Sequence, residues 1–197
     1  MTPDTETYSF PTLPDHLAPR LILVFVGINP GLYSVQRGHY FARPTNRFWP
    51  AFSRSILSAR IRARLGRGVL GPEDDARLLR FGIGFTDVVK VPSRNAAGLR
   101  PGDFQEWAPR LVDRLRTCGP KVACFHGLTG YRPFARYGLT RQLVSWSLGP
   151  QPLRVGETRL FVVPNPSPAN AHFHLRDQIA WYDRLARYVR RLAPRAL

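Results

Sequence analysis

Short runs of apolar residues recur along the chain, and the earliest limits the possible folds most. The segment Leu21–Val26 contains no polar residue and ends at Gly27. A strand that is apolar on both faces is typical of the centre of a parallel sheet covered by helices. Similar runs follow at 121–125 and 159–163, and residues 83–91 are expected to be strand or extended chain. These runs predict an α/β fold.

Segments with helical spacing alternate with the apolar runs. Helices are expected to begin at Asn46, Gly71 and Asp103, to include a stretch near 128–137, and to end with a helix over 175–192. The first of them is expected to reach Ile56 and Leu57, after a long loop over 28–45. Residues 143–155 are expected to be irregular or an edge strand.

This alternation predicts a three-layer α/β/α sandwich with a short, mostly parallel central sheet. Residues 1–19 are polar and proline-rich, and we expect them to form a tail or a surface strap. Residues 20–197 show no internal repeat and no second boundary, so a single domain is expected.

The charge of the chain is large and positive, which limits its partners. Lys and Arg number 29 against 13 Asp and Glu, for a formal charge of +16, and Lys90 and Lys121 are the only lysines. Arginine binds phosphate through a planar pair of N–H donors, so the excess indicates nucleic acid or another polyanion. Genomic base composition would explain arginine in place of lysine, but not the shortage of acids.

The chain offers few residues for metal, disulfide or membrane chemistry. Cys118 and Cys124 are its only cysteines, which excludes a disulfide framework and a four-cysteine zinc or iron–sulfur site. His172 and His174 have no third ligand nearby, so we expect no metal and no cofactor. The first residues lack the apolar segment of a signal peptide, and no run is long enough to span a bilayer. We therefore expect a cytoplasmic protein.

Two loops rich in Asn, Pro and Gly, over 27–46 and 164–171, follow strands that are expected to be central. Ligands of open parallel sheets bind beyond the carboxyl ends of the strands, so neighbouring strands would bring these loops together across a cleft. The first loop opens with Gly27-Ile-Asn-Pro-Gly31. It lacks the signatures of a phosphate loop and of a dinucleotide site, which argues against a nucleotide triphosphatase or a dehydrogenase.

Three blocks of sequence, taken in order, resemble one enzyme family. They are Gly27-Ile-Asn-Pro-Gly31, Tyr40-Phe-Ala-Arg-Pro-Thr-Asn-Arg-Phe-Trp49 and Asn165-Pro-Ser167. From about residue 20 to residue 190, the chain is similar to the mismatch-specific uracil-DNA glycosylases and their thymine-DNA glycosylase relatives. These form a branch of the uracil-DNA glycosylase superfamily. The resemblance implies an enzyme that flips a nucleotide out of the duplex and cleaves its base from the deoxyribose.

The resemblance also assigns roles to single residues. Asn29 aligns with the asparagine that positions the attacking water, and Phe41 aligns with the aromatic ring that stacks on the flipped base. Such stacking contributes about 1–3 kcal/mol per base. Backbone N–H groups around Ile28 and Phe41 are the expected partners of the base carbonyls. Tyr33 and Asn165 complete the expected base-binding set.

Asp87 is an acid within the apolar stretch Phe85–Val89. Burial of a carboxyl group is costly, so its presence in this stretch needs an explanation. One reason is a structural cap or an arginine partner. The other follows from the resemblance, because Gly82–Asp87 matches the family block beside the base pocket, where relatives carry an amide or a lysine. A carboxylate at that place would act as general base on the water or stabilise the cationic sugar. We predict that Asp87 is a second catalytic group.

The second loop departs from the family pattern. Bacterial relatives carry a leucine wedge and a nearby arginine, whereas the aligned residues here are Ala169 and Ala171. Alanine is too short to fill a vacated base stack, so either the loop sits differently or His172, Phe173 or His174 substitutes. Phe173 is the best apolar candidate, with a core contact as its alternative role. Together with Arg43, the residues expected to contact DNA from this loop are Ser167, Pro168, Ala169, Asn170, Ala171 and Phe173.

The sequence thus predicts a monofunctional DNA glycosylase that removes uracil, and by extension thymine or modified pyrimidines, from mismatched DNA. Its product would be an abasic site, which implies a downstream abasic-site endonuclease in base excision repair. We expect a nucleoid-associated monomer. Two alternatives stay open: a glycosylase for another damaged base, such as hypoxanthine, and a catalytically silent nucleic-acid-binding module on the same fold.

Overall fold

The computed structural model describes residues 9–141 and 145–194. Its centre is a five-stranded sheet with the strand order β2-β1-β3-β5-β4. Strands β2, β1, β3 and β5 are parallel, whereas β4 runs antiparallel to β5 at the edge. The strands are β1 (Leu23–Gly27), β2 (Ile83–Asp87), β3 (Val122–His126), β4 (Gly149–Val155) and β5 (Thr158–Val163). The predicted short and mostly parallel sheet is confirmed.

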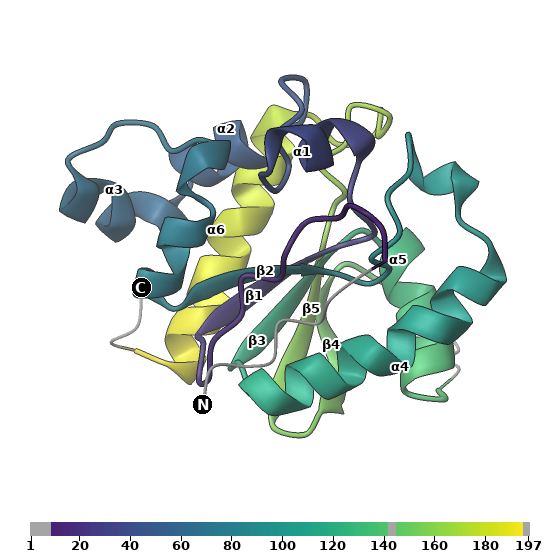
Figure 1. Cartoon of the computed structure of the whole chain (residues 1–197). Helices are drawn as coiled ribbons and strands as arrows, with labels where there is room; N and C mark the ends of the chain where they lie inside the picture. Colours follow the sequence, from purple (N-terminus) through teal and green to yellow (C-terminus); the bar gives the residue numbers. More distant parts are fainter. Residues whose placement is uncertain (1–8, 142–144, 195–197) are drawn as a thin grey trace.

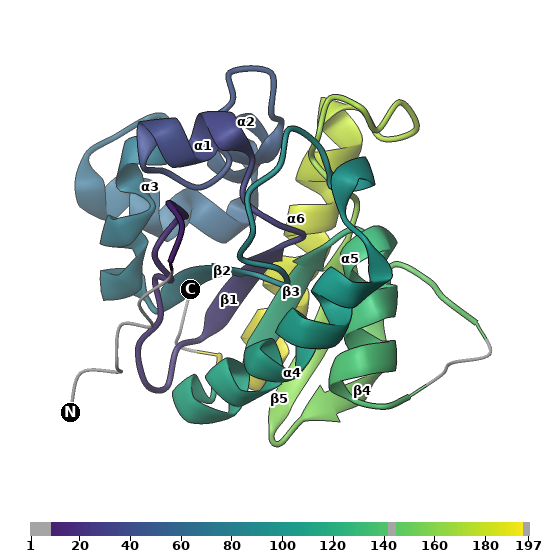
Figure 2. The same cartoon turned by 45° about the vertical axis from the view of Figure 1, so that its right-hand side comes forward.

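Helices cover both faces of the sheet (Figures 1 and 2). One face carries α1 (Leu32–Arg37), α2 (Phe48–Arg54), α3 (Ala59–Leu65) and α6 (Leu175–Leu192). The other face carries α4 (Pro101–Cys118) and α5 (Leu128–Pro133). A separate apolar cluster lies on each face, and the strands contribute alternate side chains to the two clusters. The predicted three-layer sandwich is confirmed. In the described part of the chain, no helix has the length and apolarity to cross a membrane.

Short helical turns replace some of the expected helices. They are η1 (Ile56–Ser58), η2 (Pro72–Asp74), η3 (Ala76–Phe81), η4 (Ala96–Gly98) and the π turn η5 (Phe134–Gly138). The segment that begins at Gly71 is therefore two 3₁₀ turns and not an α-helix. Helix α2 stops before Ile56 and Leu57, where the Asp183 carboxylate of α6 accepts a hydrogen bond from the Ile56 N–H (2.8 Å). This contact joins residues far apart in sequence, so local periodicity does not reveal it.

Four further segments can be compared with the expectations. The last helix covers 175–192 as predicted, and residues 149–155 form the edge strand that was one of the two options for 143–155. The expected long loop contains the short helix α1. Asp103 lies inside α4 and not before it, because the helix begins at Pro101 and the Asp103 carboxylate accepts a hydrogen bond from the Arg100 N–H (2.6 Å). Residues 142–144 lie outside the described part of the chain.

The described part of the N-terminal segment, residues 9–19, is packed as a strap along the free edge of β2. His16 and Phe85 exchange two backbone hydrogen bonds of 2.9 and 3.0 Å, which form an antiparallel bridge. Leu13 is only 2% exposed. Of the two options for this segment, its described residues therefore match the strap.

Candidate active site

The carboxyl ends of the parallel strands meet at one edge of the sheet. Gly27 at the end of β1 is paired in register with Asp87 at the end of β2, and β3 ends beside them at His126. The segments that follow β1 and β2 continue side by side beyond the sheet, because the Val88 and Val89 N–H groups donate hydrogen bonds to the Gly27 and Ile28 carbonyls. Residues from two distant segments are thereby held together at the edge where ligands of parallel sheets bind.

The Asn29 side chain is fixed in one orientation. Its Nδ2 donates hydrogen bonds to the Val91 carbonyl (2.9 Å) and to the Ser93 hydroxyl (2.8 Å). These partners use the amide N–H groups, so the network fixes which atom is Nδ2 and leaves Oδ1 as the acceptor for a ligand or a water molecule. Asn29 is half-buried. A fixed acceptor at the rim of a buried site is suited to orienting a water molecule.

Asp87, Gly27 and Phe41 converge in the space beside Asn29. A Cβ atom on Gly27 would overlap the Asp87 Oδ1 atom and lie 3.9 Å from the tip of the Phe41 ring. Glycine at this position therefore admits the carboxyl group against the backbone. Ile28, the next residue, is buried and packs closely against Gly130. Of the residues that the sequence assigned to the site, the structure brings Asp87 and Phe41 together at Gly27, and Ile28 and Asn29 follow Gly27 directly in the chain.

Asp87 is 3% exposed, and burial raises the pKa of its carboxyl group to about 7. Lys90 opposes this effect, but its Nζ lies 3.8 Å from Oδ2, which is beyond hydrogen-bond distance. A carboxyl group with a pKa near neutrality exchanges a proton at physiological pH, as a general base must. Arg114, the arginine nearest to the suggested partner role, donates a hydrogen bond to the Asp87 backbone carbonyl (3.0 Å), and its charge also lowers the pKa of the Asp87 carboxyl group, less than burial raises it.

Phe41 has a backbone conformation that non-glycine residues rarely adopt, with φ at +54°. Three hydrogen bonds hold the adjoining peptide groups: the Tyr40 N–H donates to Asp75, the Trp49 indole N–H donates to the Tyr40 carbonyl, and the Ala42 N–H donates to the Ser34 hydroxyl. Such strain costs about 1–3 kcal/mol and persists where the surroundings over-determine it, commonly at functional sites. The fold therefore directs Phe41 towards the edge of the sheet.

The Phe41 ring is supported from behind. It stacks on Phe48, with ring centroids 4.4 Å apart, and meets the edge of His126 at 4.9 Å. Burial lowers the pKa of His126 to about 3, so its ring is neutral, and its Nε2 lies 3.0 Å from the Tyr182 hydroxyl. An aromatic platform with a neutral neighbour is suited to a planar, uncharged ligand.

The loop after β5 is organised around Asn165. The Asn165 Oδ1 accepts a hydrogen bond from the Ser167 N–H (2.9 Å), and its carbonyl accepts from the Asn170 and Gln178 side chains. The carboxamide NH₂ of Asn165 is thus the part left for a ligand. β3 lies between β1 and β5, so the two loop-bearing strands are not neighbours.

Arg47 nevertheless joins the two loops. Its Nη1 donates hydrogen bonds to the carbonyls of Ser167 (2.9 Å) and Asn170 (3.2 Å), and its backbone N–H donates to the Pro166 carbonyl (3.0 Å). The sequence interpretation left Arg47 without a role, although it lies within the block that carried the resemblance.

The tip of the second loop and the first loop's arginine are exposed. Pro168, Ala169, Ala171 and Arg43 are exposed, whereas Ser167, Asn170 and Phe173 are half-buried. Figure 1 shows the loop projecting beyond the start of α6. Small side chains at an exposed tip leave little apolar volume for insertion into a base stack, as expected from Ala169 and Ala171.

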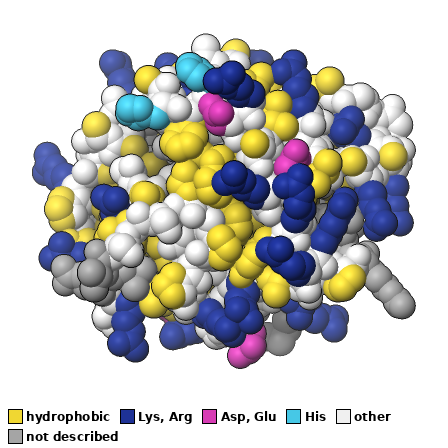
Figure 3. Space-filling model, turned by 180° about the vertical axis from the view of Figure 1, so that it is seen from behind, with side chains coloured by type: hydrophobic (Ala, Val, Ile, Leu, Met, Phe, Trp, Pro, Cys, Tyr) yellow, Lys and Arg dark blue, Asp and Glu magenta, His cyan; other side chains and the backbone are white. Residues whose placement is uncertain are grey.

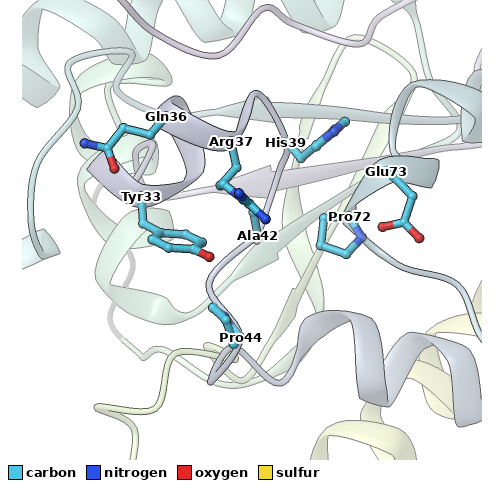
Figure 4. Close-up of a pocket in the computed structure, with 8 residues that line it drawn as sticks. All are labelled: Tyr33, Gln36, Arg37, His39, Ala42, Pro44, Pro72 and Glu73. Carbon is cyan, nitrogen blue, oxygen red and sulfur yellow. The ribbon is translucent and has the colours of Figure 1, made fainter.

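Tyr33 lies apart from the converging residues. It is 38% exposed on α1 and borders an open hollow of about 450 Å³ (Figure 4). Figure 4 shows Tyr33 and Arg37 on one side of this hollow and Pro72 and Glu73 on the other. Neither Asn29 nor Asp87 lines it. The structure therefore does not place Tyr33 with the other residues of the expected base-binding set.

Basic side chains surround the molecule outside this site. Figure 3 shows that they far outnumber acidic side chains on the face seen from behind. On α6 the exposed members include Arg184, Arg187, Arg190 and Arg191. Two of the α6 arginines lie over aromatic rings of their own helix, Arg184 over Trp181 and Arg191 over Tyr188. The site itself has few exposed charges, so the arginines supply a surface for a polyanion and not the reacting groups.

These features define an α/β protein with a candidate site at the carboxyl edge of a parallel sheet, where a buried carboxyl group and an aromatic ring meet at Gly27 and a pinned amide follows at Asn29. The chain belongs to the uracil DNA glycosylase superfamily, whose family model matches residues 14–189. It is therefore a DNA glycosylase, a hydrolase that acts on DNA.

A solved structure shares the fold. It is the solution NMR structure of a candidate uracil DNA glycosylase from Methanosarcina acetivorans, with a TM-score of 0.52 and 20% sequence identity. The similarity covers 90% of this chain and 96% of that chain.

Replacing Arg47 by methionine is expected to weaken binding to duplex DNA by about tenfold, because two charge-assisted hydrogen bonds to the second loop are lost. Fluorescence anisotropy with a labelled duplex measures the effect. Arg116→Met is the matched control, since it removes the same charge from an exposed site on α4. Equal losses in the two variants would mean that Arg47 acts through its charge alone and not by holding the loop.

Proposed function

We propose that the protein removes uracil from mismatched DNA by hydrolysis of the N-glycosidic bond, after the nucleotide has been flipped out of the duplex. The observation that carries the proposal is the buried, proton-exchanging Asp87 carboxyl group against Gly27, with the pinned Asn29 amide two residues further along the same segment. A structural module that only bound the DNA backbone would need neither group. Thymine and modified pyrimidines are further substrates in this proposal.

The reaction assigns one step to each group. Asn29 Oδ1 orients a water molecule, whose oxygen attacks C1′ of the deoxyribose while the bond from C1′ to the base nitrogen breaks. The electron pair of that bond leaves with the base, and the ionised Asp87 carboxylate accepts the proton from the water. No cofactor takes part.

The base is held by stacking and by backbone groups. Phe41 stacks on the flipped base, and N–H groups around Ile28 and Phe41 donate hydrogen bonds to its carbonyls, where negative charge develops as the bond breaks. Asn165 contributes its NH₂ group, and Tyr33 contacts the strand beside the flipped nucleotide.

The duplex is engaged by the second loop and by arginine. The loop residues from Ser167 to Ala171, together with Phe173 and Arg43, contact the strands around the flipped nucleotide. With Phe173 as the available apolar wedge, contacts to the opposite base are weak. We propose a monomer that acts in the cytoplasm on nucleoid DNA and releases an abasic site, which requires an endonuclease for such sites.

A panel of oligonucleotides tests this function. We expect uracil to be released at similar rates opposite guanine, opposite adenine and from single strands, because the second loop reads the opposite base weakly. The logarithm of the DNA-binding constant should fall against the logarithm of the salt concentration with a slope of roughly −5, if about six phosphates are neutralised. Release of hypoxanthine without uracil would reassign the substrate. DNA binding without release of any base would favour a silent binding module, and a strict preference for uracil opposite guanine would contradict the loop interpretation.

A further inference from the structure

Lys90 is a charged residue with no solvent exposure (0%) directly behind the site. Side chains of this kind are rarely buried unless they are paired, because desolvation of the ammonium group is costly. Its Nζ donates a 2.8 Å hydrogen bond to Asp15 and a 3.3 Å hydrogen bond to the Tyr40 hydroxyl. The Asp87 Oδ2 atom lies 3.8 Å from the same nitrogen. One cation thus faces two carboxyl groups, and only Asp15 is within hydrogen-bond distance.

Asp15 reaches this position from the N-terminal strap. Its Oδ1 also accepts a 2.7 Å hydrogen bond from the Thr86 hydroxyl, and its Oδ2 lies 3.3 Å from Arg114 Nε. The strap is fixed on both sides of Asp15, by the Thr12 hydroxyl on the Lys90 carbonyl and by the His16 bridge to Phe85. The geometry of Asp15 is therefore set by the fold and not by a mobile terminus.

The pKa values of the Asp15 and Asp87 carboxyl groups are shifted in opposite directions. Burial alone would raise the pKa of Asp15, but Lys90 and Arg114 outweigh it, so that this pKa is lowered. Burial raises the pKa of Asp87 to about 7, and the same two cations counter it only in part. Because Lys90 is engaged by Asp15, the carboxyl group next to Gly27 is left weakly compensated.

We propose that Asp15 is a positioning residue of the active site, which holds Lys90 away from Asp87 and thereby sets the charge state in which Asp87 meets the substrate. This deepens the proposed function, because it takes Asp87 as a reacting group. The strap then belongs to the working site, although it lies 72 residues before Asp87 in the sequence.

The groups that face Asp87 from the surrounding elements determine the expected effects. They are Lys90 beyond β2, Asp15 on the strap, Arg114 on α4 and Tyr40 before α2. Asp15→Asn removes a negative neighbour and releases Lys90 towards Asp87, so both consequences favour the ionised form of Asp87. Lys90→Met removes the nearest cation and favours the neutral form. A variant that only loosened the strap would admit water and lower the pKa of Asp87 in both cases.

The experiment is a titration of the full-length protein by NMR, with a ¹³C label on aspartate carboxyl groups and assignment through Asp87→Asn. We expect the Asp87 midpoint to fall by about one pH unit in Asp15→Asn and to rise by about one pH unit in Lys90→Met. The double variant Asp15→Asn/Lys90→Met should titrate near the wild type. Asp113→Asn and Lys121→Met are matched controls, because both residues are exposed and lie outside this group of charges.

Shifts in the same direction, or no shift in Asp15→Asn, would overturn the proposal. Asp15→Asn is nearly isosteric, so it decides the matter even if Lys90→Met fails to fold. The pH dependence of single-turnover uracil release gives a separate result. If the NMR midpoints move in opposite directions but the pH dependence of the rate does not move with them, Asp15 sets the pKa of Asp87 as proposed. In that case the proposal that fails is the catalytic role of Asp87.

Discussion

Asp87→Asn should lower the single-turnover rate of uracil release by about 10²–10⁴-fold at pH 8, the usual contribution of a positioned general base. The amide keeps the shape of the side chain beside Gly27 but cannot accept the proton from the attacking water. Asp87→Ala should lose at least as much. Binding of uracil-containing DNA should change little, because the loss lies in the chemical step.

The pH dependence follows from the pKa of Asp87, which burial raises to about 7. Below this value the carboxyl group is neutral and the wild-type rate should fall with the ionised fraction. Above it the rate should be level. Asp87→Asn should show no such step. Rates measured in single turnover between pH 5 and pH 9, at constant ionic strength, distinguish the two profiles.

The stability of the folded protein should fall with rising pH, whereas the rate of uracil release rises. A raised pKa means that ionisation of Asp87 favours the unfolded chain, so its cost to the native state grows as pH rises from the unfolded value near 4 to about 7, and remains above that. Asp87→Asn should therefore unfold at the same or a higher temperature than the wild type at pH 8. Asp113→Asn, an exposed acid-to-amide change on α4, is the control for both measurements. Near wild-type rates in Asp87→Ala would show that the carboxyl group is not a reacting group.

The parts of the fold that local sequence determines were predictable. The apolar runs marked the central strands, and the spacing of apolar residues placed the last helix at 175–192. Where distant contacts decide, the local pattern was wrong or left alternatives open. Helix α2 stops before Ile56, whose N–H donates to Asp183 of α6, and the choice between tail and strap is decided by the His16 bridge to Phe85. Neither contact leaves a local pattern.

The site was predictable to the extent that motifs carried it. Asn29, Phe41 and Asp87 were each predicted from their blocks, and the fold places the Asp87 carboxyl group and the Phe41 ring beside Gly27. Their supports were not found, because Lys90 pairs with Asp15 across 75 residues. One signal did exist. In a chain whose cations are almost all arginine, one of the two lysines follows an apolar run directly after Asp87.

Asn29 gives the second large effect, and its variants separate orientation of the water from binding of the base. Asn29→Ala should reduce the single-turnover rate by about 10²-fold, the scale of misplacing one reactant, and leave the Kd for uracil-containing DNA unchanged. Asn29→Asp keeps an acceptor but loses the donors to Val91 and Ser93, and it places a carboxylate against that carbonyl, so it should not restore the rate.

Ser93→Ala is the informative comparison for Asn29, because it removes one of the two short hydrogen bonds that hold the amide and leaves Oδ1 in place. The Ser93→Ala rate should lie between those of the wild type and Asn29→Ala, since the amide is less firmly held but still present. Each lost hydrogen bond should cost about 1 kcal/mol of unfolding free energy, measurable by urea denaturation. If Asn29→Ala instead weakened DNA binding and kept the wild-type rate of base release, Asn29 would be a base contact, and the water would have to be oriented by Asp87 alone.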